Sequence, residues 1–140
     1  METLKPHITF SGKCREALQF YCACFDGEVI LMQTFDDAPV ELLEVDSNRI
    51  MHAEFESSGI SFMASDGMVD EPIAGSGSVA LAINFCEPDE QDKVFAALSH
   101  GGQVIMPLSE MFWSARFGQV VDKYGIRWML NCPLTGEGSE

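Results

Sequence analysis

The segment from Arg49 to Glu56 combines a histidine with two carboxylates at a spacing that suits acid–base chemistry. His52, Glu54 and Glu56 occupy alternate positions of this predicted strand, so their side chains share one face. A histidine beside a carboxylate can serve as an acid–base pair or as part of a metal site. A hydrogen-bonded structural histidine beside two solvated glutamates would give the same pattern. His52 and Glu54 are therefore candidate catalytic and ligand-binding residues.

A second candidate histidine lies on the first predicted strand, Leu4 to Phe10. His7 points away from the apolar positions of that strand, so it could act as a ligand or as a base. A partly exposed strand histidine is the alternative interpretation. His100 ends a predicted helix, where the helix dipole favours a cation, and no functional role is predicted for it.

Two aromatic residues and an arginine come together just before the last predicted hairpin. Phe112, Trp113 and Arg116 could bind a flat or anionic ligand through stacking and charge. Packing of the two rings in the core, with Arg116 paired to a surface carboxylate, explains the same residues. The sequence does not decide between these interpretations.

Hydrophobic periodicity and turn residues predict the elements that must position these side chains. The first half contains strands at 4–10, 28–35, 49–56 and 60–64 and a helix at 14–25. The second half contains strands at 78–85, 103–106, 117–121 and 126–131 and a helix at 89–100. Both halves therefore have the order strand, helix, strand, strand, strand.

The two halves also match in sequence. A shift of 66 positions places Gly125 to Met129 on Gly59 to Met63. A shift of 75 positions places Val104-Ile105 on Val29-Ile30. The shifts differ by nine residues, which we assign to the polar loop from Asp36 to Asn48 in the first copy.

This duplication predicts an α+β fold of two tandem βαβββ units within one domain. The first unit covers residues 1–66, a linker 67–77, the second unit 78–132 and a flexible acidic tail 133–140. Antiparallel sheets tolerate one wet face. Two curved mixed sheets placed side by side, each with a helix on one face, would therefore enclose a cleft that can hold a small ligand.

Composition excludes several classes of partner. A chain of 140 residues can bury one core, and its net charge of −14 argues against nucleic acid, which needs clustered cations. No apolar run is long enough to span a membrane, and the N-terminus lacks the pattern of a signal peptide. The five cysteines cannot all pair with one another, which favours reduced thiols in the cytoplasm over a catalytic thiol.

Four segments together resemble the vicinal oxygen chelate superfamily of glyoxalase I, extradiol dioxygenases, fosfomycin-resistance enzymes and bleomycin-resistance proteins. They are Phe10–Tyr21, Ile50–Phe55, Phe62–Asp66 and Phe112–Asn131. Within it they are most similar to the PhnB-like branch, which carries the label 3-demethylubiquinone methyltransferase-like. The resemblance implies paired βαβββ units and a homodimer. A methyltransferase role has no support, because no glycine-rich cofactor loop follows a strand.

In the metal-dependent members, His, Gln or Glu from the first and last strands of both units hold a divalent ion. Here the resemblance places Pro6 near the first of these positions, with His7 pointing the other way, and Met63 and Met129 at the two last-strand positions. The segment 78–83 offers no good ligand. Thioethers are poor donors for hard metals, so we expect no metal and no cofactor, and Met63 and Met129 would line an apolar pocket or simply pack.

Two functions follow, and whether the protein is an enzyme stays open. The first is a metal-free, homodimeric, cytoplasmic protein that binds a small molecule of unassigned identity. The alternative is a metal-dependent lyase, isomerase or dioxygenase-type enzyme, with a divalent metal at a shifted site built from His7 and His52. The alternative requires both imidazoles to lie on one sheet face and to converge within one coordination sphere.

Overall fold

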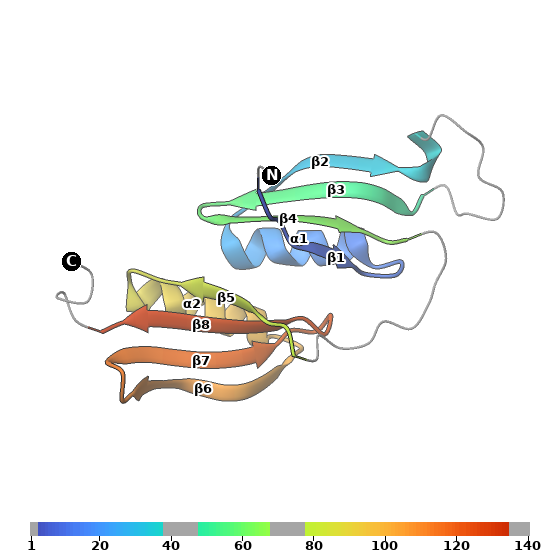
Figure 1. The fold of residues 1–140 in the computed structure, drawn as a ribbon. Helices are drawn as coiled ribbons and strands as arrows, with labels where there is room; N and C mark the ends of the chain where they lie inside the picture. The colour runs from blue at the N-terminus through green and yellow to red at the C-terminus, as the bar shows by residue number, and fades with distance from the viewer. Residues whose placement is uncertain (1–2, 38–47, 68–77, 135–140) are drawn as a thin grey trace. The chain divides into compact units, whose positions relative to one another are not determined.

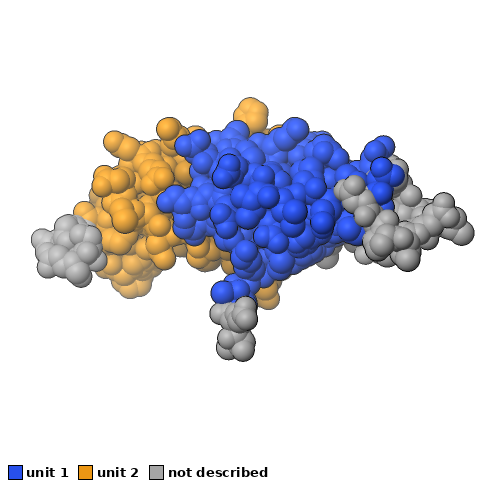
Figure 2. Space-filling model, turned by 90° about the horizontal axis from the view of Figure 1, so that it is seen from above, with its two compact units in different colours: residues 1–73 blue, residues 74–140 orange. Residues whose placement is uncertain are grey.

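The computed structural model describes residues 3–37, 48–67 and 78–134. The chain divides into two compact units, Met1–Ile73 and Ala74–Glu140 (Figure 2). Most of the loop predicted at 36–48, nearly all of the linker predicted at 67–77 and most of the tail predicted at 133–140 lie outside the described residues. Neither helix of the described part is long and apolar enough to cross a membrane.

Both units have the predicted βαβββ order (Figure 1). The first contains β1 (His7–Thr9), α1 (Cys14–Phe25), β2 (Glu28–Thr34), a 3-10 turn (Phe35–Asp37), β3 (Ile50–Ser57) and β4 (Ile60–Ser65). The second contains β5 (Leu81–Asn84), α2 (Pro88–Ser99), β6 (Gln103–Met111), β7 (Ala115–Val121) and β8 (Arg127–Pro133).

The two sheets share one topology. Their strand orders are β1-β4-β3-β2 and β5-β8-β7-β6. In each, the first strand runs parallel to the last, and the remaining neighbours are antiparallel. The mixed sheets, each with one helix against one face, confirm the predicted α+β fold of two similar units (Figure 1).

The duplication is also visible at the glycine that follows each helix. A Cβ built on Gly27 would lie 2.8 Å from the carbonyl oxygen of Glu56, and one built on Gly102 would overlap the carbonyl oxygen of Val121. The turn that leaves each helix therefore passes against the backbone of another strand with no room for a side chain. Gly27 and Gly102 correspond under the shift of 75 residues.

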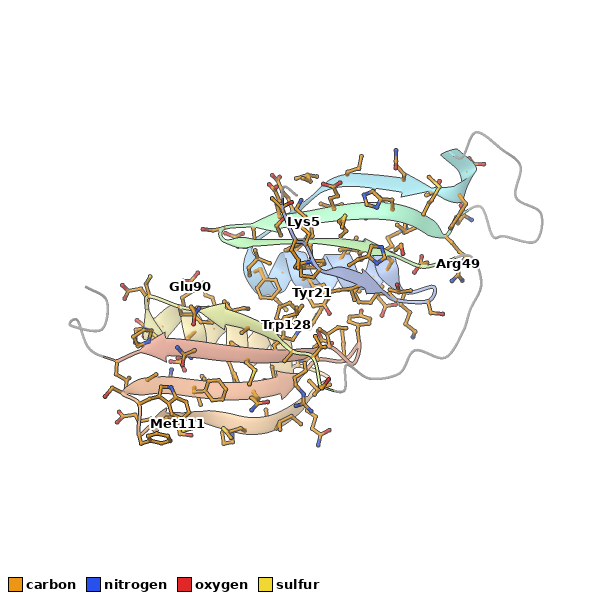
Figure 3. The ribbon with its side chains drawn as sticks, in the orientation of Figure 1. Lys5, Tyr21, Arg49, Glu90, Met111 and Trp128 are labelled. Atoms are coloured by element: carbon orange, nitrogen blue, oxygen red, sulfur yellow. The ribbon has the colours of Figure 1, made fainter. Side chains whose placement is uncertain are left out.

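The core of each unit lies between its helix and its sheet. In the first unit, Tyr21 of α1 meets the edge of Phe62 at 5.7 Å between ring centroids, and Phe62 stacks on Phe55 at 4.9 Å. Figure 3 shows Tyr21 and Lys5 on opposite sides of this sheet. In the second unit, the buried Trp128 donates a 2.8 Å hydrogen bond from its indole N–H to Asp122.

Several predicted strand boundaries are wrong. The first strand of each unit is shorter than predicted, at His7–Thr9 instead of 4–10 and at Leu81–Asn84 instead of 78–85. The strand predicted at 103–106 continues as β6 to Met111, across Pro107. Proline is tolerated there because β6 is an edge strand and its outer N–H groups need no partner in the sheet. Register shifts on both sides of Met106 accommodate the irregular segment.

Candidate functional site

Each sheet has an open face, by which we mean the face opposite its helix. On the open face of the first unit, His7, Met63 and Glu54 lie side by side on β1, β4 and β3, as the strand register shows. The intervening residues Ile8 and Ala64 are buried on the helix side. The register thus makes a row of an imidazole, a thioether and a carboxylate.

The structure brings His52 and Glu54 together on this face, as the spacing predicts. The Nε2 atom of His52 lies 3.2 Å from a carboxylate oxygen of Glu54. The ammonium group of Lys5 lies 3.9 Å from the other oxygen of the same carboxylate. Glu54 therefore lies between the His52 imidazole and the Lys5 ammonium group, both partly exposed. The His52–Glu54 pair can exchange a proton or hold a polar ligand group.

The position expected for a first metal ligand is off by one residue. His7, not Pro6, is level with Met63, and the carbonyl oxygen of Pro6 instead accepts a 2.9 Å hydrogen bond from the Met63 N–H. A shift of one residue exchanges the two faces of a strand. His7 therefore shares the open face with Met63.

His7 and His52 share the open face but lie on different strands. His7 is on β1 and His52 on β3, and β4 separates them. Strands spaced by about 4.8 Å place β1 and β3 about 10 Å apart, and His52 lies two residues along β3 from Glu54, the residue level with His7 across β4. Within the described ranges, no group of three or more His, Cys, Asp or Glu side chains could hold a metal ion. The donors therefore do not fit a conventional metal site.

The open face of the second unit is built from uncharged side chains at its centre. Met129 of β8 lies between Ala82 of β5 and Gln119 of β7. One step along the face, Asn131 lies between Asn84 and Phe117. Met129 and Asn131 are half-buried, whereas the alternate residues Trp128, Leu130 and Cys132 are buried on the helix side.

Phe112, Trp113 and Arg116 do not form one group. Phe112 is 95% exposed and Trp113 49% exposed, so core packing does not explain these rings. Trp113 contacts Phe117 edge-on, with 5.9 Å between centroids. Arg116 is level with the buried Cys132 on the helix side, where its guanidinium forms hydrogen bonds with side chains of α2.

The partners of Arg116 explain its orientation. Its guanidinium lies 2.7 Å from the carboxylate of Asp92 and 3.3 Å from the amide oxygen of Gln91. This is the ion pair that the alternative interpretation of Arg116 predicts. The buried Gln91 amide also donates to the carbonyl oxygens of Arg116 and Leu130 at 2.9 Å and 3.1 Å, so this cluster holds α2 against the sheet.

The buried Cys14 thiol cannot serve as a nucleophile at neutral pH. Burial raises its pKa to about 12, and the nearby carboxylate of Asp66 adds to this effect. A thiol of this pKa is protonated at pH 7 and unreactive. All five cysteines are free, and burial also raises the pKa values of Cys22 and Cys132.

Sequence inspection did not single out Gln119, Asn131 or Arg127, which lie on the open face of the second unit. Arg127 is level with Val121 at one end of the hairpin. The alternation around Trp128 and Leu130 could have identified Arg127 and Asn131, because it assigns Arg127, Met129 and Asn131 to one face of the strand.

A family model described as 3-demethylubiquinone-9 3-methyltransferase matches residues 2–131. Among solved structures, protein PA1353 from Pseudomonas aeruginosa is 34% identical, with a TM-score of 0.81, over 94% of this chain and 98% of that one. A PhnB protein from Bacillus cereus is 29% identical, with a TM-score of 0.79, over 94% of this chain and 99% of that one.

More distant structures share the fold. A glyoxalase/bleomycin resistance protein from Albidiferax ferrireducens T118 is 13% identical, with a TM-score of 0.60, over 92% of this chain and 97% of that one. The paired βαβββ units thus have the architecture of glyoxalase/bleomycin resistance proteins. Since the family model covers nearly the whole sequence, the chain belongs to the PhnB-like family described as 3-demethylubiquinone-9 3-methyltransferase.

Proposed function

We propose that the protein binds a small molecule on the open faces of its sheets without a metal ion. One observation carries this proposal: partly exposed polar and thioether side chains stand in register on the sheet face that no helix of the same unit covers. In the first unit these are His7, Met63 and Glu54, and in the second Met129 and Gln119. Flexible thioethers suit an adaptable pocket, and the polar groups would orient the ligand.

The proposal includes a homodimer in the cytoplasm. Phe112 and Trp113 expose adjoining aromatic surface, with 4.9 Å between their ring centroids. Exposed aromatic pairs are typical of interaction sites, which supports a second copy as the partner. Five free cysteines support a reducing compartment. Light scattering after size exclusion should give twice the 15.4 kDa chain mass, and a monomer would contradict this part.

A thermal-shift screen with metal-depleted protein tests the binding function. Compounds that raise Tm should also bind by calorimetry in the presence of EDTA. Glu54→Gln or Met129→Ala should weaken hits that use the respective face. Lys93→Gln, an exposed change on α2, is the control and should leave binding unchanged. If no compound binds, or if every hit is insensitive to substitutions on both open faces, the binding function is wrong.

The alternative is a metal-dependent enzyme. It is favoured by one observation, that His7 and His52 share the open face with the Glu54 carboxylate. Metal analysis after incubation with Zn, Mn, Ni and Fe tests it. Stoichiometric retention that is lost in His7→Ala and His52→Ala would favour the enzyme, and would justify assays for isomerase, lyase and dioxygenase chemistry. Absence of retention would exclude this site.

A further inference from the structure

Arg127 carries a buried polar atom without a partner. The Nε atom of its guanidinium is buried and makes no hydrogen bond with any residue that the structure describes. No ion pair joins Arg127 to a carboxylate of the described ranges. A buried donor without an acceptor is costly and rare. Its presence points to an acceptor that the described residues do not supply.

The lack of a described acceptor for the Arg127 Nε atom contrasts with the acidic composition of the chain. The chain has 22 acidic and 8 basic residues, not counting histidine, so carboxylates are abundant. The other three arginines all have acceptors. Arg116 pairs with Asp92, Arg49 donates to the carbonyl oxygens of Asp66 and Gly67, and Arg15 contacts the Met32 sulfur.

The surroundings of Arg127 suit an organic anion with a flat ring. Arg127, Met129 and Asn131 follow one another on the open face of β8, level with Val121, Gln119 and Phe117 of β7. The Phe117 ring at the far end contacts Trp113, which is half exposed. At about 3.3 Å per residue, the backbones of Arg127 and Asn131 lie about 13 Å apart, and the long arginine side chain can shorten that span.

We propose that the open face of the second unit binds an elongated aromatic carboxylate. Its anionic group bonds the Arg127 guanidinium, its ring packs on Phe117 and Trp113, and Gln119 contacts polar atoms between the two ends. Guanidinium and carboxylate match in geometry and charge. This inference rests on the proposed binding function. It adds the class of ligand, the arginine that binds the anionic group, and the direction in which the ligand lies along β8. Arg127 thus takes the cationic role that the sequence suggested for Arg116.

ω-Phenylalkanoates and their primary amides test the proposal as matched probes. Calorimetry with the full chain should show that the acid binds more tightly than its amide, and that this ratio is largest near 6-phenylhexanoate, whose length spans ring and guanidinium. Loss of a charge-assisted bond should weaken the acid about ten- to hundredfold. In Arg127→Gln the acid should fall to the affinity of the amide, whereas Phe117→Ala should weaken acid and amide alike.

Lys93→Gln removes the same charge from an exposed helix position and should preserve the acid-to-amide ratio. Arg127→Gln should keep the wild-type Tm, since Nε has no described partner to lose; a large drop in Tm would show that Arg127 is structural and overturn the proposal. Equal affinities for acid and amide, or an affinity for the acid that Arg127→Gln does not change, would overturn the anion site. The proposed binding function would still stand if other compounds from the screen bind. If neither these probes nor any screened compound binds, both proposals fail.

Discussion

The Asp66 carboxylate should be among the most sensitive positions for stability. It is 3% exposed and accepts hydrogen bonds from the backbone N–H groups of Gly12, Cys14 and Ile50 at 2.8, 2.8 and 2.9 Å. One side chain therefore satisfies donors at the start of α1 and at the start of β3. In Asp66→Ala all three donors lose their acceptor.

The expected cost follows from burial. Water can reach Gly12, which is exposed, but the bonds to Cys14 and Ile50 are buried. Each unsatisfied buried donor costs about 1–3 kcal/mol, so Asp66→Ala should lose about 2–6 kcal/mol of unfolding free energy. Small domains have about 5–15 kcal/mol in total. The substitution should therefore consume much of the stability of the first unit.

Urea unfolding, followed by tryptophan fluorescence and by circular dichroism, measures this loss of unfolding free energy. Both tryptophans, Trp113 and Trp128, belong to the second unit, whereas circular dichroism reports both units. Asp66→Ala should shift the circular dichroism transition to lower urea. Asp92→Ala, which removes an exposed carboxylate from the Arg116 ion pair, should cost less than about 1 kcal/mol. A loss below about 1 kcal/mol for Asp66→Ala would refute the capping role.

Two further substitutions test separate parts of the account. Gly102→Ala should lower the unfolding free energy by about 1–3 kcal/mol, because the added Cβ would overlap the Val121 carbonyl oxygen; an unchanged Tm would contradict the close approach. The folded pKa of Cys14, about 12, lies above the ordinary 9.0, so its stabilising contribution is complete below pH 9 and is lost as pH rises toward 12. Between pH 8 and 10.5 the wild type should lose about 2 kcal/mol more than Cys14→Ala, and equal losses would show that the Cys14 thiol is not buried in its protonated form.

The fold could be predicted because the repeat and the periodicity agree. The two sequence shifts align the strands of the first sheet with those of the second, and the structure shows the same topology in both. Gly27 and Gly102 occupy equivalent positions after the helix of each unit, where a side chain would not fit. The ends of the strands were less predictable: β1 and β5 are shorter than the pattern indicates, and β6 continues across Pro107, which an edge strand accommodates.

The candidate site could be predicted only in part. Alternation correctly brings His52 and Glu54 to one face at 3.2 Å. Grouping Arg116 with its sequence neighbours Phe112 and Trp113 was misleading. Arg116 lies inside β7, where the alternation of side chains places it on the helix side, and its partner Asp92 is on α2. Arg127 stood out only once its unpartnered Nε was visible, which no local pattern encodes.

Methyl NMR on protein labelled at its eight methionine methyl groups tests the central claim most directly. Met63 and Met129 mark the middle of the two open faces, and Met63→Leu and Met129→Leu assign their resonances. In the presence of EDTA, titration with hits from the screen should shift one or both of these resonances saturably. If binding leaves both resonances in place, or if they respond only when a divalent metal is supplied, metal-free binding on the open faces is wrong.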